Sequence, residues 1–127
     1  MTEVLIIDDD IIMRECLRTA METALPTLHV NVAPNGRSAF KIFNRLTVDL
    51  VITDLIMPEM DGTEFIIKAR EKNPQLKIIA YSGGGRVEPH VYLEVARKLG
   101  AKYTFPKPFL LEELLEAVKK LLPDIAA

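Results

Sequence analysis

The chain has 127 residues, 49% of them hydrophobic and 27% charged, with a formal net charge of -2. This length suits one globular domain with a sizeable core, and the near-balanced charge lacks the basic excess of a nucleic-acid-binding protein. No apolar run approaches the ~20 residues of a membrane span, and the start, Met1-Thr2-Glu3, lacks the cationic and apolar segments of a signal peptide, so we expect a cytoplasmic protein without membrane contacts.

Strand-like and helix-like patterns alternate along the chain. Short apolar runs rich in β-branched residues are typical of buried strands, and apolar residues at helical spacing are typical of amphipathic helices. In chain order, the sequence predicts the strand Val4–Ile7, the helix Ile11–Leu25, the strand Leu28–Ala33, the helix Ser38–Leu46, a strand from Leu50 to Asp54, the helix Gly62–Lys72, the strand Leu76–Tyr81, the helix Pro89–Leu99, the strand Tyr103–Pro106 and the helix Leu110–Leu122.

Apolar stripes on three of these helices are expected to face the core. The stripe of the first helix comprises Ile12, Cys16, Leu17, Ala20, Met21 and Ala24, that of the fourth comprises Tyr92, Val95, Ala96 and Leu99, and that of the last comprises Leu111, Leu114, Leu115, Val118, Leu121 and Leu122. Cys16 is the only cysteine, so it is expected to be a buried helix residue rather than part of a disulfide or a metal cage. His29, in the second strand, is expected to be exposed.

Five strand and helix pairs indicate an α/β fold with a parallel sheet between two layers of helices. In so small a chain, right-handed crossovers favour a flavodoxin-like (βα)5 three-layer sandwich with five parallel strands in the order 2-1-3-4-5. Residues 1–127 are expected to form this single domain without an attached effector domain, since only Asp124 to Ala127 follow the Pro123 that ends the last helix.

Acidic residues follow two strands that are neighbours in this order. Asp8, Asp9 and Asp10 come after the first strand, and Asp54 ends the third. Two unit charges about 4 Å apart repel by roughly 4 kcal/mol at an effective dielectric constant near 20, so such a cluster needs a cation or a raised pKa. Hard oxygen ligands without His or Cys indicate Mg2+. The alternative is that Asp54 only ends its strand and caps the segment that follows.

Two further polar groups lie at the ends of the fourth and fifth strands. Asp54 can act as a nucleophile in phosphoryl transfer, Lys107 can neutralise the transferring group, and the Ser82 hydroxyl can donate to a product oxygen. Taken alone, Lys107 could be a solvated strand end and Ser82 a turn residue. The run Gly83 to Gly85 is expected to be either mobile or closely approached by a ligand.

These motifs closely resemble the receiver domains of two-component response regulators, in particular the single-domain, chemotaxis-regulator-like members. The resemblance rests on Asp8-Asp9, on the stretch from Asp54 to Gly62, on Ser82 and on Lys107-Pro108-Phe109.

The resemblance implies that Asp54 is the phosphoacceptor for a histidine kinase or histidine phosphotransfer protein. It also implies that Mg2+ is bound by Asp9, Asp54 and the backbone carbonyl of Ile56, with Asp8 acting largely through metal-bound water. The Lys107–Pro108 peptide bond is expected to be cis. The downstream protein partner is expected on the face formed by helix Pro89–Leu99, strand Tyr103–Pro106 and helix Leu110–Leu122.

The chain departs from the family pattern at Thr104, a position often occupied by an aromatic switch residue. We therefore expect switching to be registered mainly in the Gly83 to Gly85 loop and at the start of the Pro89 helix.

One rival function remains open. A haloacid-dehalogenase-like phosphatase would use Asp8 as its nucleophile, because Asp8-Asp9-Asp10 contains the spacing Asp-x-Asp after a first strand.

Overall fold

A computed structural model of the chain describes residues 2–57, 60–83 and 89–123. Five strands and five helices alternate in these ranges: β1 (Thr2–Ile7), α1 (Ile11–Ala24), β2 (Leu28–Ala33), α2 (Gly36–Arg45), β3 (Leu50–Asp54), α3 (Gly62–Lys72), β4 (Lys77–Ser82), α4 (Pro89–Lys98), β5 (Tyr103–Pro106) and α5 (Leu111–Leu121). None of the helices in the described ranges has both the length and the hydropathy needed to cross a bilayer.

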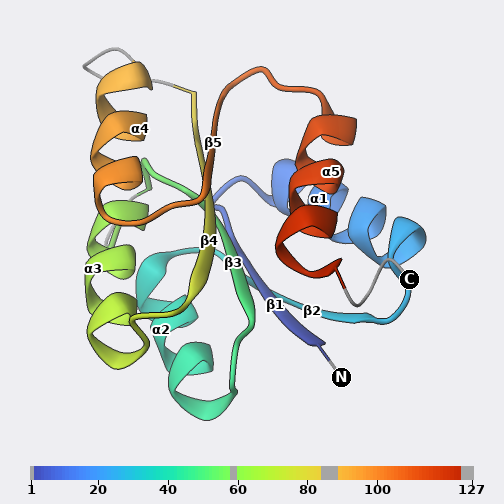
Figure 1. Cartoon of the computed structure of the whole chain (residues 1–127), viewed down its shortest axis with the longest axis horizontal. Helices are drawn as coiled ribbons and strands as arrows, with labels where there is room; N and C mark the ends of the chain where they lie inside the picture. Colours follow the sequence, from blue (N-terminus) through green and yellow to red (C-terminus); the bar gives the residue numbers. More distant parts are fainter. Residues whose placement is uncertain (1, 58–59, 84–88, 124–127) are drawn as a thin grey trace.

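The strands form one parallel sheet in the order β2-β1-β3-β4-β5, which confirms the predicted topology. Helices α1 and α5 cover one face of this sheet, and helices α2, α3 and α4 cover the other (Figure 1). The register pairs Ile7 of β1 with Thr53 of β3, and Asp54 of β3 with Tyr81 of β4. The carboxyl ends of these strands are therefore level, and the residues that follow them meet at one edge.

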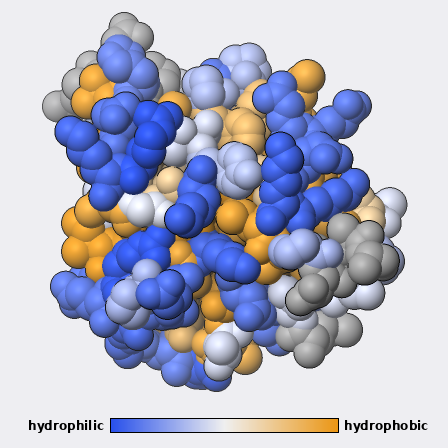
Figure 2. Space-filling view, in the orientation of Figure 1, coloured by the Kyte–Doolittle hydropathy of each residue, from blue (hydrophilic) through white to orange (hydrophobic). Residues whose placement is uncertain are grey.

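Two hydrophobic clusters, one on each face of the sheet, explain why the strands are apolar throughout. Side chains of successive strand residues point to opposite faces. In β1, Leu5 and Ile7 belong to the cluster with α2, α3 and α4, whereas Val4 and Ile6 belong to the cluster with α1 and α5. Outside this core, hydrophilic side chains cover most of the visible surface, with smaller hydrophobic areas between them (Figure 2).

Polar caps set the starts of three helices. The side chains of Asp10, Asn35 and Asp61 accept hydrogen bonds from backbone N–H groups in the first turns of α1, α2 and α3. The cap at Asn35 starts α2 at Gly36, two residues before the predicted start. Asp54 caps none of these three helices, because Asp61 caps the one that follows β3.

The predicted stripes of α1, α4 and α5 were too wide. Ile12, Cys16, Ala24, Val95 and Leu111 are exposed, and Ile12 and Val95 are 72% and 42% exposed. Consecutive helix residues differ by about 100° in direction. The residues that reach the core are Leu17 and Met21 in α1 and Leu93 and Ala96 in α4, so the neighbours Cys16 and Val95 point away. His29 is exposed, as predicted, and pairs with Glu3.

Candidate functional site

Three carboxylates meet where β1 and β3 end. One ligand oxygen each from Asp8, Asp9 and Asp54 lies within 4.8 Å of the other two. Asp8 is fully buried and Asp54 is 5% exposed, whereas Asp9 is exposed. Asp10 has a different task, because its side chain accepts a hydrogen bond of 2.9 Å from the Ile12 N–H at the start of α1. The three clustered oxygens fit a divalent cation, which would offset their mutual repulsion.

Asp8 is held by hydrogen bonds to both of its carboxylate oxygens. Its Oδ1 accepts from the Asp10 N–H at 2.8 Å, and its Oδ2 accepts from the Tyr81 hydroxyl at 2.6 Å. The guanidinium of Arg14, on α1, donates to the Asp8 carbonyl oxygen at 2.9 Å. The side chain and backbone of Asp8 are therefore fixed from two elements, α1 and β4.

Asp54 is paired with the predicted lysine. Its Oδ1 accepts from the Ile56 N–H at 3.2 Å, and its Oδ2 lies 3.2 Å from the ammonium nitrogen of Lys107. The same nitrogen lies 4.0 Å from Asp8 Oδ2. The Lys107–Pro108 bond is cis, as predicted, and the Lys107 N–H donates to the Ser82 carbonyl at 2.9 Å. The structure thus brings Lys107 to the carboxylate cluster.

Ser82 is the last residue of β4 and is fully buried. It follows Tyr81, which pairs in register with Asp54, so Ser82 stands at the same edge of the sheet. Ile56 is half-buried beside Asp54, but the assignment of its carbonyl to a cation stays a prediction. Gly83 is exposed, whereas Gly84 and Gly85 lie outside the described residues, as does the predicted behaviour of their loop.

Burial raises the pKa of two groups in this site. Burial raises the pKa of the Asp54 carboxyl above its ordinary value, and the Asp8 charge adds to this, while the Ile56 N–H and the Lys107 ammonium oppose it. Burial and the charge of Asp8 also raise the pKa of the Tyr81 hydroxyl, which therefore stays protonated and able to donate at neutral pH.

The raised pKa of Asp54 predicts that Asp54→Asn stabilises the metal-free protein at neutral pH. With a raised pKa, the folded state binds more protons than the unfolded state, so ionisation of Asp54 costs stability as pH rises. The gain in unfolding free energy on substitution should therefore grow as pH rises above the ordinary aspartate pKa of about 3.9, and level off once Asp54 is ionised in the folded state. Urea unfolding in chelator measures this gain. Asp49→Asn, one residue before β3, serves as the control. A gain that does not grow as pH rises above about 3.9 would contradict the raised pKa.

Sequence reasoning missed Tyr81 and Arg14 as parts of the site. Tyr81 was predicted only as the end of a strand. The available signal was strand parity, because the residue before Ser82 must point to the opposite face, toward α1 and Asp8. No signal of this kind identified Arg14, whose contact depends on the position of α1 over the sheet edge.

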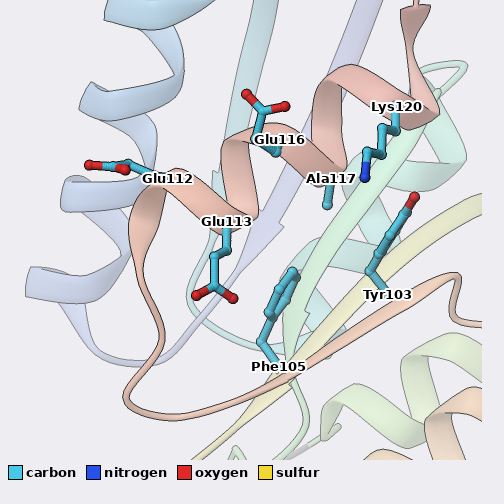
Figure 3. A pocket seen from close by; sticks show the side chains of 7 residues that line it. All are labelled: Tyr103, Phe105, Glu112, Glu113, Glu116, Ala117 and Lys120. Atoms are coloured by element: carbon cyan, nitrogen blue, oxygen red, sulfur yellow. The ribbon is translucent and has the colours of Figure 1, made fainter.

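A second concave surface lies between β5 and α5, and none of Asp8, Asp9 and Asp54 lines it. Its volume is about 420 Å³. Side chains from both elements line it (Figure 3): Tyr103 and Phe105 from β5, and Glu112, Glu113, Glu116, Ala117 and Lys120 from α5. The Glu113 side chain extends toward Phe105 and the Lys120 side chain toward Tyr103, whereas the Glu112 and Glu116 carboxylates point away from the rings (Figure 3).

The chain is similar to known proteins in sequence and in structure. Residues 4–119 match the family described as the response regulator receiver domain. The chain is 36% identical over 122 residues to the response regulator receiver protein CpdR of Brucella abortus, covering 96% of this chain and 98% of that protein. It is 33% identical over 120 residues to the chemotaxis protein CheY of Listeria monocytogenes, covering 94% and 98%. Among solved structures, response regulator protein TrrA of Thermotoga maritima, in complex with Mg(2+)-BeF, has a TM-score of 0.78 at 30% identity and covers 95% of this chain and 99% of that one.

Proposed function

Because the chain belongs to the response regulator receiver domain family, we propose that Asp54 is the phosphoacceptor of this signalling protein. A histidine kinase or histidine phosphotransfer protein supplies the phosphoryl group, and the phosphorylated chain signals to a partner protein. The observation that carries the assignment is the pairing of Asp54 with Lys107 at 3.2 Å, at an edge where Asp8 and Asp9 also converge. That the receiver acts without an attached effector domain stays a prediction.

The residues divide the work of phosphoryl transfer. A carboxylate oxygen of Asp54 attacks the phosphorus atom, a new O–P bond forms, and the P–N bond to the donor histidine breaks, leaving its electron pair on the ring nitrogen. The Lys107 ammonium offsets negative charge on the phosphoryl oxygens, and the Ser82 hydroxyl donates to one of them. Bound Mg2+, held by Asp9, Asp54 and the Ile56 carbonyl with Asp8 beside it, would supply further positive charge.

The surroundings of Asp8 argue against the phosphatase that would use it as nucleophile. Both of its carboxylate oxygens accept hydrogen bonds, and its side chain is fully buried. Asp8 therefore offers no exposed oxygen to a phosphoryl donor, whereas Asp54 is 5% exposed. We propose instead that each chain takes up one phosphoryl group on Asp54 and assists its own phosphorylation and dephosphorylation.

Asp9→Ala tests the magnesium site. This exposed carboxylate is one of three in the cluster, and sites with few protein ligands retain several waters, so affinity should be modest and should fall about tenfold or more in the variant. Without metal, loss of one charge relieves repulsion, so the chelated variant should melt no lower than wild type. Titration calorimetry and thermal unfolding measure the two effects.

Glu22→Ala, an exposed acid on α1 that pairs with Arg18, is the matched control and should leave magnesium affinity unchanged. A clear fall in the melting temperature of chelated Asp9→Ala would contradict the repulsive cluster. An unchanged magnesium affinity in that variant would remove Asp9 from the site.

We propose that the partner protein binds the face of α4, β5 and α5. The groove between β5 and α5 supports this, because the rings of Tyr103 and Phe105 line it and the Glu113 side chain extends toward Phe105 (Figure 3). Glu112 and Glu116 add two more carboxylates to its lining. A partner segment with Lys or Arg next to apolar side chains would complement it. At the position of the usual aromatic switch, Thr104 Oγ1 accepts a hydrogen bond of 2.7 Å from Arg97 of α4.

Beryllofluoride, a mimic of the phosphoryl group, should therefore change amide chemical shifts most at residues 83 to 95, apart from the site itself. The Ser82 hydroxyl gains a charge-assisted hydrogen bond to the new oxygens, and the segment that follows it moves with it. Asp54→Asn should show none of these shifts. If the largest chemical-shift changes outside the site fall on α1 and the shifts of residues 83 to 95 do not change, this account of the switch is wrong.

A further inference from the structure

Tyr81, in β4, contacts two of the predicted site residues, Asp8 and Lys107. It is fully buried, and its hydroxyl donates to Asp8 Oδ2 at 2.6 Å. The ammonium nitrogen of Lys107 lies 5.1 Å from the centre of its ring, within cation–π range. The ring also packs against Phe109, at 5.3 Å between centroids. The Tyr81 side chain thus contacts both the Asp8 carboxylate and the Lys107 ammonium group.

Lys107 has two carboxylates within reach, and their distances differ. Its nitrogen lies 3.2 Å from Asp54 Oδ2 but 4.0 Å from Asp8 Oδ2. The Asp8 oxygen that faces Lys107 is the one that accepts the Tyr81 hydroxyl. A hydroxyl proton directed at this oxygen offsets part of its negative charge and occupies one of its acceptor directions. The attraction of Asp8 for the ammonium group is weakened accordingly.

We propose that Tyr81 is a positioning residue that keeps the Lys107 ammonium group paired with the Asp54 carboxylate rather than with that of Asp8. Its hydroxyl occupies the competing oxygen of Asp8, and the face of its ring supports the ammonium group between the two acids. This inference rests on the proposed function, since Lys107 matters for phosphoryl transfer only if Asp54 is the acceptor. Without the hydroxyl, Asp8 Oδ2 would be a buried anion lacking this donor, and Lys107 would move toward it.

Tyr81→Phe tests the proposal, because it removes the hydroxyl and keeps the ring that packs on Phe109 and lies under Lys107. With acetyl phosphate and saturating magnesium, the phosphorylation rate should fall about tenfold, the factor that matches the loss of roughly one hydrogen bond in the transition state. Tyr92→Phe is the matched control, since this half-buried tyrosine of α4 packs against the hydrophobic cluster on the opposite face of the sheet. Its rate should stay at the wild-type value.

A double-mutant cycle separates positioning from a general structural role. If Tyr81 acts through Lys107, Tyr81→Phe should not slow phosphorylation further in a Lys107→Gln background. Equal slowing in both backgrounds would overturn the proposal, as would a rate that recovers fully at saturating magnesium, which would indicate an effect on metal affinity alone.

A spectroscopic measurement tests the same contact without phosphorylation. In chelator, the side-chain Nζ and Cε resonances of Lys107 should shift in Tyr81→Phe and stay in place in Tyr92→Phe. Unmoved resonances in Tyr81→Phe would refute the positioning role. If the Lys107 resonances shift as expected but the wild-type protein takes up no phosphoryl group, the proposed function fails and the contact between Tyr81, Asp8 and Lys107 stands.

Discussion

Asp54→Asn should abolish phosphorylation while leaving the fold intact. Incubation with acetyl phosphate and magnesium should add about 80 Da to the wild-type chain, the mass of one phosphoryl group, and nothing to the variant. The amide of Asn has the shape of the carboxylate but lacks the anionic oxygen that would attack phosphorus. Its neutral oxygen also weakens the pairing with Lys107, which lies 3.2 Å away in the wild type. Intact-protein mass spectrometry measures the result.

Asp49→Asn provides the matched control, because it makes the same chemical change one residue before β3 rather than at the end of that strand. Asp49 is exposed, and its carboxylate accepts a hydrogen bond from the Glu3 N–H. This variant should gain the same mass as the wild type. Full mass gain in Asp54→Asn would show that another side chain accepts the phosphoryl group.

Gly62→Ala should lower both stability and magnesium affinity. A Cβ at position 62 would lie 2.1 Å from the Asp54 carbonyl oxygen and 2.8 Å from the Leu55 Cα. These are backbone atoms at the site itself, so they cannot yield without displacing Asp54. Overpacking of this kind costs about 1–3 kcal/mol or more, whereas Ala in place of Gly gains only about 1 kcal/mol within a helix. The net effect on the free energy of unfolding should be unfavourable.

Gly83→Ala is the control for this substitution. Its Cβ would approach the side-chain Cδ of Lys107 at 3.0 Å, and a flexible side chain can move away. Urea unfolding should show a clearly smaller loss for Gly83→Ala than for Gly62→Ala. Equal losses would mean that the close approach of Gly62 to the Asp54 backbone is not what matters.

The strand ends could be predicted from the sequence because each polar group follows an apolar run. The runs before Asp8, Asp54, Ser82 and Lys107 fix four strands, and a parallel sheet brings their carboxyl ends to one edge. The order of the strands then makes Asp8 and Asp54 neighbours. Periodicity and topology were therefore sufficient for the fold and for the carboxylate cluster.

The remaining features depend on tertiary contacts that apolar patterns do not encode. The sequence shows Ile12, Cys16 and Leu17 as equally apolar, but only Leu17 reaches the sheet. From the sequence, Tyr81 is only a strand residue. In the structure it pairs in register with Asp54, and its hydroxyl donates to Asp8. The division of Lys107 between two acids is a matter of 0.8 Å, the difference between 4.0 and 3.2 Å.

The identity of the phosphorylated residue in the wild-type chain tests the central claim most directly. After incubation with acetyl phosphate and magnesium, borohydride reduction converts an aspartyl phosphate into a stable alcohol that peptide sequencing by mass spectrometry can locate. We predict that the modification falls on Asp54 and on no other acid of the cluster. Modification of Asp8 in its place would contradict the receiver mechanism and favour the phosphatase chemistry that uses the first strand.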